Sequence, residues 1–195
     1  EAPVFRAKEG AEDDEALGAE DLKKIEFGSK DVLVGIAASG RTPYVLGAME
    51  YAKKLGAPVI GVSCCPGSQV DEAADIGIAP TPGPEVVTGS TRMKAGTAQK
   101  LILNMISTAT MVGCGKAYSN LMVDVMQTNE KLVVRAQNIV MEATGVSRDS
   151  AKEAIALAGG SCKLAVTMIL ADCTVEEAKE RLERCGGSVR QAIAL

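Results

Sequence analysis

Small and cationic residues gather in one stretch of the chain, residues 83–101, which reads GPEVVTGSTRMKAGTAQKL. The stretch runs directly into LILNMISTATMV, an apolar run that predicts a long buried helix over residues 91–113. Glycine lets a backbone approach a ligand closely, and the N–H groups of a first helical turn point towards anions. The hydroxyl and cationic donors here are Ser90, Thr91, Arg92 and Lys94. This combination predicts a site for an anion such as a phosphate.

A second loop, ASGRTP at residues 38–43, has the same character. It follows the apolar run at residues 31–38 and opens a helix at Thr42 and Pro43, so it also lies where a strand ends and a helix begins. In an open parallel sheet, ligands bind at that edge. Helix capping alone explains many such loops, but two at one edge with cationic side chains favour an anion site. Neither loop matches the dinucleotide GxGxxG pattern or a P-loop.

A run of carboxylates, EGAEDDEALG, begins at Glu9. Acidic residues in a first helical turn usually offset the helix dipole, and from the sequence alone this is the favoured role. The chain contains no histidine, so any acid–base chemistry within it falls to carboxylates, Lys, Tyr or Cys. Glu12, in the middle of the run, is therefore one candidate among several.

The elements that position these loops alternate between strand and helix. Apolar runs predict strands at residues 31–38, 58–63 and 74–80, separated by helical segments, which is the rhythm of a parallel sheet with helices on both faces. The texture changes near residue 145, where short amphipathic helices and Gly-Gly pairs begin. We therefore expect an α/β domain over residues 1–144 and a small helical module over residues 145–195. SRDSAKEAI and TVEEAKERL within it are a weak internal repeat.

Composition limits the classes of partner. The net charge is −4, which argues against nucleic acid and anionic membrane surfaces. No apolar run reaches the roughly 18 residues of a membrane span, and no signal-peptide pattern is present. The six cysteines form no CxxC pair, which is typical of reduced thiols in a cytoplasmic protein. The start, EAPVFRAKEG, has no initiator Met, so we expect the chain to be a piece of a longer protein.

Several segments together resemble a known family. GIAASGRTPY, ADIGIAPTPGPEVVTGSTRMKAGTAQKLILNMIST, NLMVDV and EGAEDDEALG are similar to the N-acetylmuramic acid 6-phosphate etherases. That family has the sugar isomerase (SIS) fold, a three-layer α/β fold with a parallel sheet, and it is related to the glucokinase regulatory protein. The resemblance extends from Glu9 to the C-terminal helices. The order of GPE, GSTRMK and GTAQK makes it specific.

The resemblance implies an activity and a set of residues. The reaction converts N-acetylmuramic acid 6-phosphate into N-acetylglucosamine 6-phosphate and D-lactate, without a metal or organic cofactor, in a cytoplasmic homodimer. Glu12 matches one of the two catalytic glutamates. The other glutamate, with a first phosphate loop, belongs to an earlier portion that we expect to be missing here. The substrate-binding positions implied by the family's turns are Ser39, Gly40, Glu85, Ser90, Thr91, Arg92 and Lys94.

Two other functions remain open at this point. A phosphosugar-binding regulator without turnover, like the glucokinase regulatory protein, would share these turns. A structural α/β domain whose capped helices bind nothing would share the helix starts alone. The AASGRTP loop and the short length favour the etherase.

Overall fold

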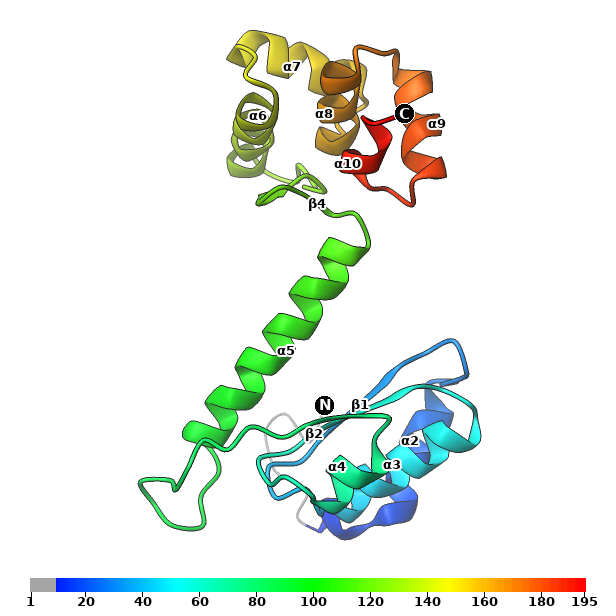
Figure 1. Cartoon of the computed structure of the whole chain (residues 1–195), viewed down its shortest axis with the longest axis vertical. Coiled ribbons are helices and arrows are strands. Elements are labelled where there is room, and N and C mark those ends of the chain that lie inside the picture. Colours follow the sequence, from blue (N-terminus) through cyan, green and yellow to red (C-terminus); the bar gives the residue numbers. More distant parts are fainter. Residues whose placement is uncertain (1–9) are drawn as a thin grey trace. The chain divides into compact units, whose positions relative to one another are not determined.

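The computed structural model describes residues 10–195, which divide into two compact units, residues 10–104 and 105–195 (Figure 1). The first unit begins with a short 3-10 turn, η1 (Ala11–Asp13), and continues as α2 (Glu15–Lys24), β1 (Leu33–Ile36), α3 (Pro43–Lys54), β2 (Val59–Val62), α4 (Gln69–Ala73) and β3 (Ile76–Ile78). Helix α5 (Lys94–Gly113) begins in the first unit and ends in the second. The second unit continues with β4 (Ala117–Tyr118), β5 (Leu121–Met122), α6 (Glu130–Thr144), α7 (Arg148–Leu157), α8 (Cys162–Ala171), α9 (Val175–Arg184) and α10 (Val189–Ala192).

The three strands of the first unit form a parallel sheet in the order β1-β2-β3. Their register places Gly35, Gly61 and Gly77 side by side in one row across the sheet. A Cβ atom at Gly35 would meet the Met49 side chain of α3, and Cβ atoms at Gly61 and Gly77 would meet Val70 and Asp71 of α4. The glycine row therefore lets both helices lie directly on the strands.

Helices α3 and α4 consequently cover the same face of the sheet, because residues paired in parallel register point to the same side. The opposite face carries only Val and Ile from these strands, and Ile76 on it is 59% exposed. The sequence predicts helices on both faces. In the described part of the chain, the two helices that pack on this glycine row, α3 and α4, lie on one face of the sheet.

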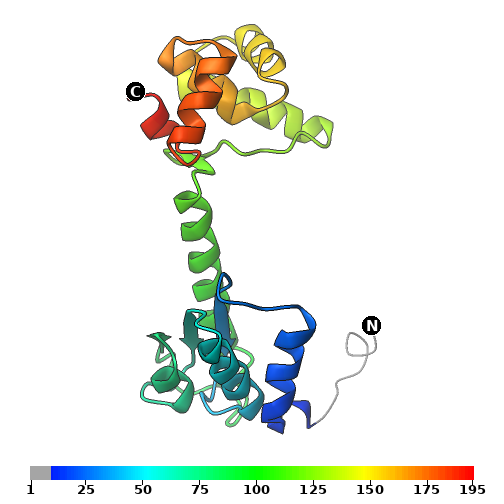
Figure 2. The ribbon, with the colours of Figure 1, turned by 90° about the vertical axis from the view of Figure 1, so that its right-hand side faces the viewer.

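Helices α2 and α3 cross at two glycines (Figure 2). A Cβ atom on Gly18 would lie 2.1 Å from the Tyr44 carbonyl oxygen, and one on Gly47 would lie 2.0 Å from that of Glu15. The Tyr44 hydroxyl also donates to Asp21 of α2 across 3.0 Å. Burial of Leu22, Met49 and Val59 in one core holds α2, α3 and the sheet together.

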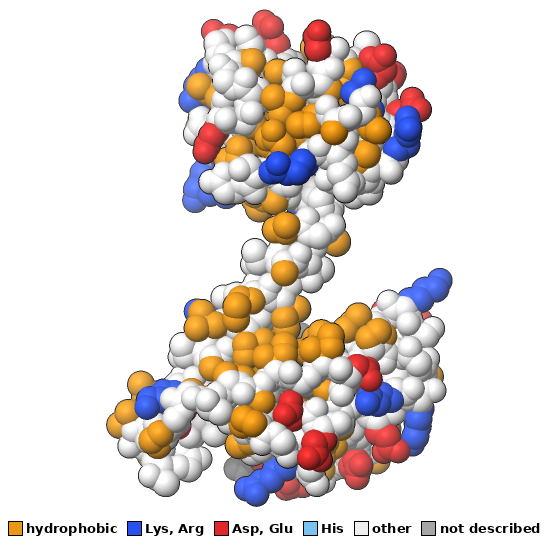
Figure 3. Space-filling view, in the orientation of Figure 1, with side chains coloured by type: hydrophobic (Ala, Val, Ile, Leu, Met, Phe, Trp, Pro, Cys, Tyr) orange, Lys and Arg blue, Asp and Glu red, His pale blue; other side chains and the backbone are white. Residues whose placement is uncertain are grey.

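Helix α5 differs from its prediction in two ways. It starts at Lys94 rather than at residue 91, and of its residues only Ala95 and Ile102 are buried. Hydrophobic side chains lie at the surface along it, as Figure 3 shows. Leu101, Met105 and Met111 are among its exposed residues. Apolar composition correctly predicted the helix but not its exposure, because burial depends on what packs against the helix.

The second unit is built of helices that pack around one core, and α6 is one of these helices. Ala136, Ile139 and Val140 on the inner face of α6 are buried with residues of α7, α8 and α9. The boundary expected near residue 145 therefore falls inside this compact unit, and the contacts divide the chain after Asn104 instead. The change of sequence texture at residue 145 marks the end of one amphipathic helix, and Gly145 closes it in the left-handed conformation.

The weak internal repeat corresponds to a repeated structure. Each copy is a helix, a Gly-Gly-Ser turn and a second helix, namely α7 with α8 and α9 with α10. Both glycines of both turns have positive φ, and a hydroxyl side chain caps each helix start. The residues at matching positions of the two copies are also buried alike, as for the alanine pair Ala151 and Ala178.

No single helix in the described part of the chain is long and apolar enough to cross a membrane. Helices α7 and α8 reach that length and hydropathy only as a pair, which is bent by 109°.

Candidate active site

The first cleft of the α/β unit has a volume of about 370 Å³ and brings together two segments that are separate in the sequence. Its lining residues are Glu12, Asp13, Ser39, Arg41, Thr42 and Pro43. Glu12 and Asp13 come from η1, and the others come from the loop between β1 and α3. The predicted catalytic carboxylate thus lies in the same cleft as the predicted anion-binding loop.

The four carboxylates at the start of α2 have different positions. Asp14 is the N-cap of α2, and its side chain accepts the backbone N–H of Leu17 across 3.1 Å. Glu15 is the first residue of the helix. Glu12 and Asp13 precede the cap in η1, where their side chains line the cleft. The role of offsetting the helix dipole therefore belongs to Asp14 and Glu15, which leaves Glu12 available for chemistry.

The loop at residues 38–43 takes its shape from Gly40. This residue has φ of 69°, and its carbonyl accepts the N–H of Val70 at the start of α4 across 2.9 Å. A Cβ atom at Gly40 would lie 2.1 Å from the Ser68 hydroxyl oxygen. The loop is thereby held against the loop that follows β2. Gly40 thus shapes the cleft through its backbone, while Ser39 presents an exposed hydroxyl to it.

Arg92 and Lys94 line a different cleft, of about 620 Å³, together with Pro82, Met93, Thr97, Ala98 and Leu101. We expected Ser39, Ser90, Thr91, Arg92 and Lys94 around one anion. The structure instead divides the cationic residues between two clefts, one with Arg41 and one with Arg92 and Lys94. Ser90 and Thr91 line neither of the two, and they precede the first helical residue, Lys94.

The N-terminus of α5 already holds an anion, which is the side chain of Glu85. Its two carboxylate oxygens accept the backbone N–H groups of Lys94 and Ala95, each across 3.1 Å. These bonds, the Ala95 bond first, hold the pKa of Glu85 below its ordinary value. The Glu85 carboxylate explains why the helix begins at Lys94, since it caps the chain there. In this structure Glu85 acts as a helix cap. Its role in substrate binding remains a prediction.

The capping bonds of Glu85 predict a pH effect. A depressed pKa means that the carboxylate stabilises the folded state fully above its ordinary pKa of 4.5, and that this contribution is lost as the pH falls through the lowered folded value. We expect the amide signals of Lys94 and Ala95 to shift together in NMR spectra as Glu85 titrates below that value. The Glu85→Gln variant should not show this shift. Lys94 and Ala95 signals that are unchanged by acid would show that the cap does not form.

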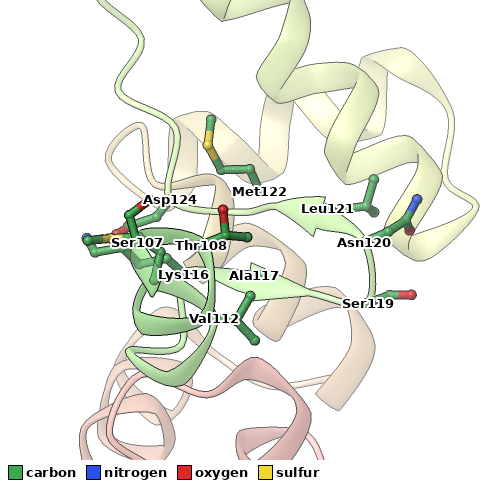
Figure 4. A pocket seen from close by; sticks show the side chains of 11 residues that line it. Ser107, Thr108, Val112, Lys116, Ala117, Ser119, Asn120, Leu121, Met122 and Asp124 are labelled. Atoms are coloured by element: carbon green, nitrogen blue, oxygen red, sulfur yellow. The ribbon is translucent and has the colours of Figure 1, made fainter. Parts of the chain in front are cut away.

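A third cleft, of about 520 Å³, lies in the second unit between the C-terminal turns of α5 and the β4–β5 hairpin (Figure 4). It is lined by Ser107, Thr108, Met111, Val112, Lys116, Ala117, Ser119, Asn120, Leu121, Met122 and Asp124. Its cation is already paired, because Lys116 donates to Asp124, and the hydrogen bond lowers the pKa of Asp124. Lys163 lies 3.9 Å from the other oxygen of the same carboxylate. This cleft holds none of the residues predicted for the site.

Arg41 lines the first cleft but is not among the predicted site residues, although the sequence analysis counted its charge in favour of an anion site at this loop. Its signal was present, since it stands between Gly40 and Thr42 in the predicted loop. Within residues 10–195, no group of three or more His, Cys, Asp or Glu side chains is placed to hold a metal ion. On the face shown in Figure 3, acidic and basic side chains are interspersed.

Comparison with known proteins supports the resemblance. Residues 1–53 match the model of the glucokinase regulatory protein N-terminal SIS domain. An N-acetylmuramic acid 6-phosphate etherase of Photorhabdus laumondii is 58% identical over 98% of this chain, and one of Aeromonas hydrophila is 58% identical over 96%. The N-acetylmuramic acid 6-phosphate etherase 2 of Vibrio cholerae is 54% identical over 97%.

The chain spans 64%, 63% and 62% of the lengths of these three relatives. The match covers both units, including η1, the loop at residues 38–43 and the turn before α5. Along nearly its whole length this chain is therefore a relative of the N-acetylmuramic acid 6-phosphate etherases, and its parallel α/β sheet is of the SIS type.

Proposed function

We propose that the full-length protein is a lyase that cleaves the D-lactyl ether of N-acetylmuramic acid 6-phosphate. The products are N-acetylglucosamine 6-phosphate and D-lactate, and the reaction belongs to amino-sugar recycling or catabolism. The observation that carries the proposal is the shared cleft of Glu12 and the 38–43 loop. The relatives named as etherases supply the substrate.

The proposed chemistry is an elimination followed by a hydration. In the open-chain sugar, the C1 aldehyde acidifies the proton on C2, and Glu12 removes that proton as a base. The electron pair forms the C2–C3 double bond while the C3–O bond breaks, and a separate acid protonates the departing lactate oxygen. Water then adds its hydroxyl at C3 and returns a proton to C2. Two carboxylates suffice for these proton transfers, so we propose that no metal or organic cofactor takes part.

Ser39 and Gly40 on one side, and Ser90, Thr91, Arg92 and Lys94 on the other, are the proposed substrate-binding positions. Exposure of Ser39, Arg92 and Lys94 supports this assignment, because a ligand can reach all three side chains. Further proposals are that the protein works in the cytoplasm as a homodimer, without nucleic acid or membrane partners. The net charge of −4 supports the last of these.

A phosphosugar-binding regulator is the second candidate, because the matched model over residues 1–53 is that of a regulatory protein's SIS domain. Its distinguishing property would be binding without turnover. The etherase names of the relatives, over nearly the whole chain, favour the enzyme.

The deciding experiment measures D-lactate release from N-acetylmuramic acid 6-phosphate by the full-length protein. We expect release in stoichiometric amounts with N-acetylglucosamine 6-phosphate, and in deuterium oxide we expect one deuteron at C2 of the product. Binding of both sugar phosphates by calorimetry without lactate release would support the regulator and contradict the enzyme. Absence of any binding would leave a structural domain.

A further inference from the structure

Arg41 is an exposed cation that lines the first cleft. Among residues 10–195 it has neither an ion pair nor a side-chain hydrogen bond, although Glu12 and Asp13 line the same cleft. Its backbone is held on both sides. Gly40 is bonded to Ala37 and Val70, and the carbonyl of Thr42 accepts the N–H groups of Val45 and Leu46. The side chain thus leaves a fixed loop and remains available for a ligand.

The proposed substrate carries two anions at opposite ends, the phosphate on C6 and the carboxylate of the lactyl group on C3. Two clefts of the first unit are lined by different cations, Arg41 in one and Arg92 with Lys94 in the other. The lactyl group is attached to C3, which is the neighbour of the carbon where Glu12 acts. The cation that shares a cleft with Glu12 is therefore the one placed for the lactyl carboxylate.

Guanidinium suits this task better than the other donors of the cleft. Its planar fork binds a carboxylate through two parallel hydrogen bonds, which fixes orientation as well as position. A third carboxylate, that of the lactyl group, brought beside Glu12 and Asp13 would otherwise be repelled by their like charges. The positive charge of Arg41 in the same cleft offsets that repulsion.

We propose that Arg41 binds the lactyl carboxylate of the substrate and is the residue that selects lactyl ethers among sugar phosphates. This inference rests on the proposed function. It adds to that function a residue that determines specificity, because Arg41 would recognise the leaving lactyl group in the cleft that also holds Glu12.

The test uses the full-length protein with three variants, Arg41→Ala, Arg41→Lys and Arg92→Ala. The ligands are the substrate, its lactamide analogue, in which an amide replaces the carboxylate, and N-acetylglucosamine 6-phosphate, which keeps the phosphate but has no lactyl group. Steady-state kinetics follow ether cleavage of the first two, and calorimetry measures the affinity for the third. Because Arg41 is exposed, thermal denaturation should show the fold of each variant unchanged.

We expect Arg41→Ala to lower kcat/KM for the substrate by about 10- to 100-fold, the usual effect of losing a charged hydrogen bond. Arg41→Lys should restore part of this loss, since it keeps the charge but not the fork. The lactamide analogue should be cleaved equally by wild type and Arg41→Ala, and affinity for N-acetylglucosamine 6-phosphate should be the same in both. Arg92→Ala should weaken binding of every ligand, because all three carry the phosphate.

Two results would overturn the inference. A loss of affinity for N-acetylglucosamine 6-phosphate in Arg41→Ala would place Arg41 on the phosphate. An unchanged kcat/KM for the substrate would remove Arg41 from the ligand altogether. In both cases wild-type lactate release would still stand, so the proposed function would survive. Failure of the wild-type protein to release lactate would overturn the function and this inference together.

Discussion

Replacement of Glu12 by glutamine in the full-length protein is expected to slow lactate release by about 10²- to 10⁴-fold, the usual span for loss of a general acid or base. Glutamine keeps the size of the side chain but cannot accept the C2 proton. The fold should be unchanged, because Glu12 is exposed in η1 and carries no part of the fold's hydrogen bonding among the described residues. Substrate affinity should change little, because glutamine has the same size and can still form hydrogen bonds. Steady-state kinetics and calorimetry measure the two quantities separately.

The matched control is Asp13→Asn, which removes the same charge from the same cleft. We expect it to reduce the rate far less than Glu12→Gln does. Proton abstraction depends on the one carboxylate that reaches C2, whereas the electrostatic effect of a negative charge would be similar from either residue. Glu12→Gln should also stop exchange of the C2 hydron of N-acetylglucosamine 6-phosphate with solvent deuterium. Equal rate losses in the two variants, or normal exchange in Glu12→Gln, would exclude Glu12 as the base at C2.

The second large effect is expected at Gly47, where α3 crosses α2. A methyl group there would lie 2.0 Å from the Glu15 carbonyl oxygen, a backbone atom that cannot rotate away. The helices would have to separate, so Gly47→Ala should lower the free energy of unfolding by about 1–3 kcal/mol or more, as overpacking does. Urea denaturation followed by circular dichroism measures this change.

Gly96→Ala is the control for that substitution. Gly96 lies in α5, and its added Cβ would meet only the Thr91 carbonyl oxygen, at an ordinary 3.6 Å. Alanine in a helix is favoured over glycine by roughly 0.5–1 kcal/mol, so this variant should be as stable as wild type or slightly more stable. A Gly47→Ala variant as stable as Gly96→Ala would show that α2 and α3 do not cross at this glycine.

The strands and most helix starts could be predicted from the sequence because local signals determine them. Thr42 and Pro43 at the start of α3, Gly56 after its end, and the hydroxyl caps of α7 and α9 stand where the structure has them. The parallel order of the strands follows from apolar runs that alternate with helices.

What the sequence could not provide depends on contacts between distant residues. The carboxylate of Glu85 reaches forward to the amides of Lys94 and Ala95, so the first turn of α5 is displaced from the apolar pattern that predicted it. The different positions of Glu12 and Asp14 likewise could not be predicted from a run of four acidic residues. Only the 3-10 turn places Glu12 in η1 and leaves Asp14 as the N-cap of α2. The division of the cations between two clefts requires coordinates for the same reason.

The repeated helical hairpin of the second unit has a consequence for the order of folding. Its helices are joined by short Gly-Gly-Ser turns and pack on near neighbours in the chain, whereas Leu33 must find Val59, and Ile60 must find Ile76, before the sheet exists. Contacts that close short loops form faster than contacts that close long ones. During refolding from denaturant, the α7–α10 region should therefore gain protection from hydrogen exchange before the strands do. A region that leaves the ribosome after the sheet would then be the quicker to fold, and the cleft that holds Glu12 would be completed after it.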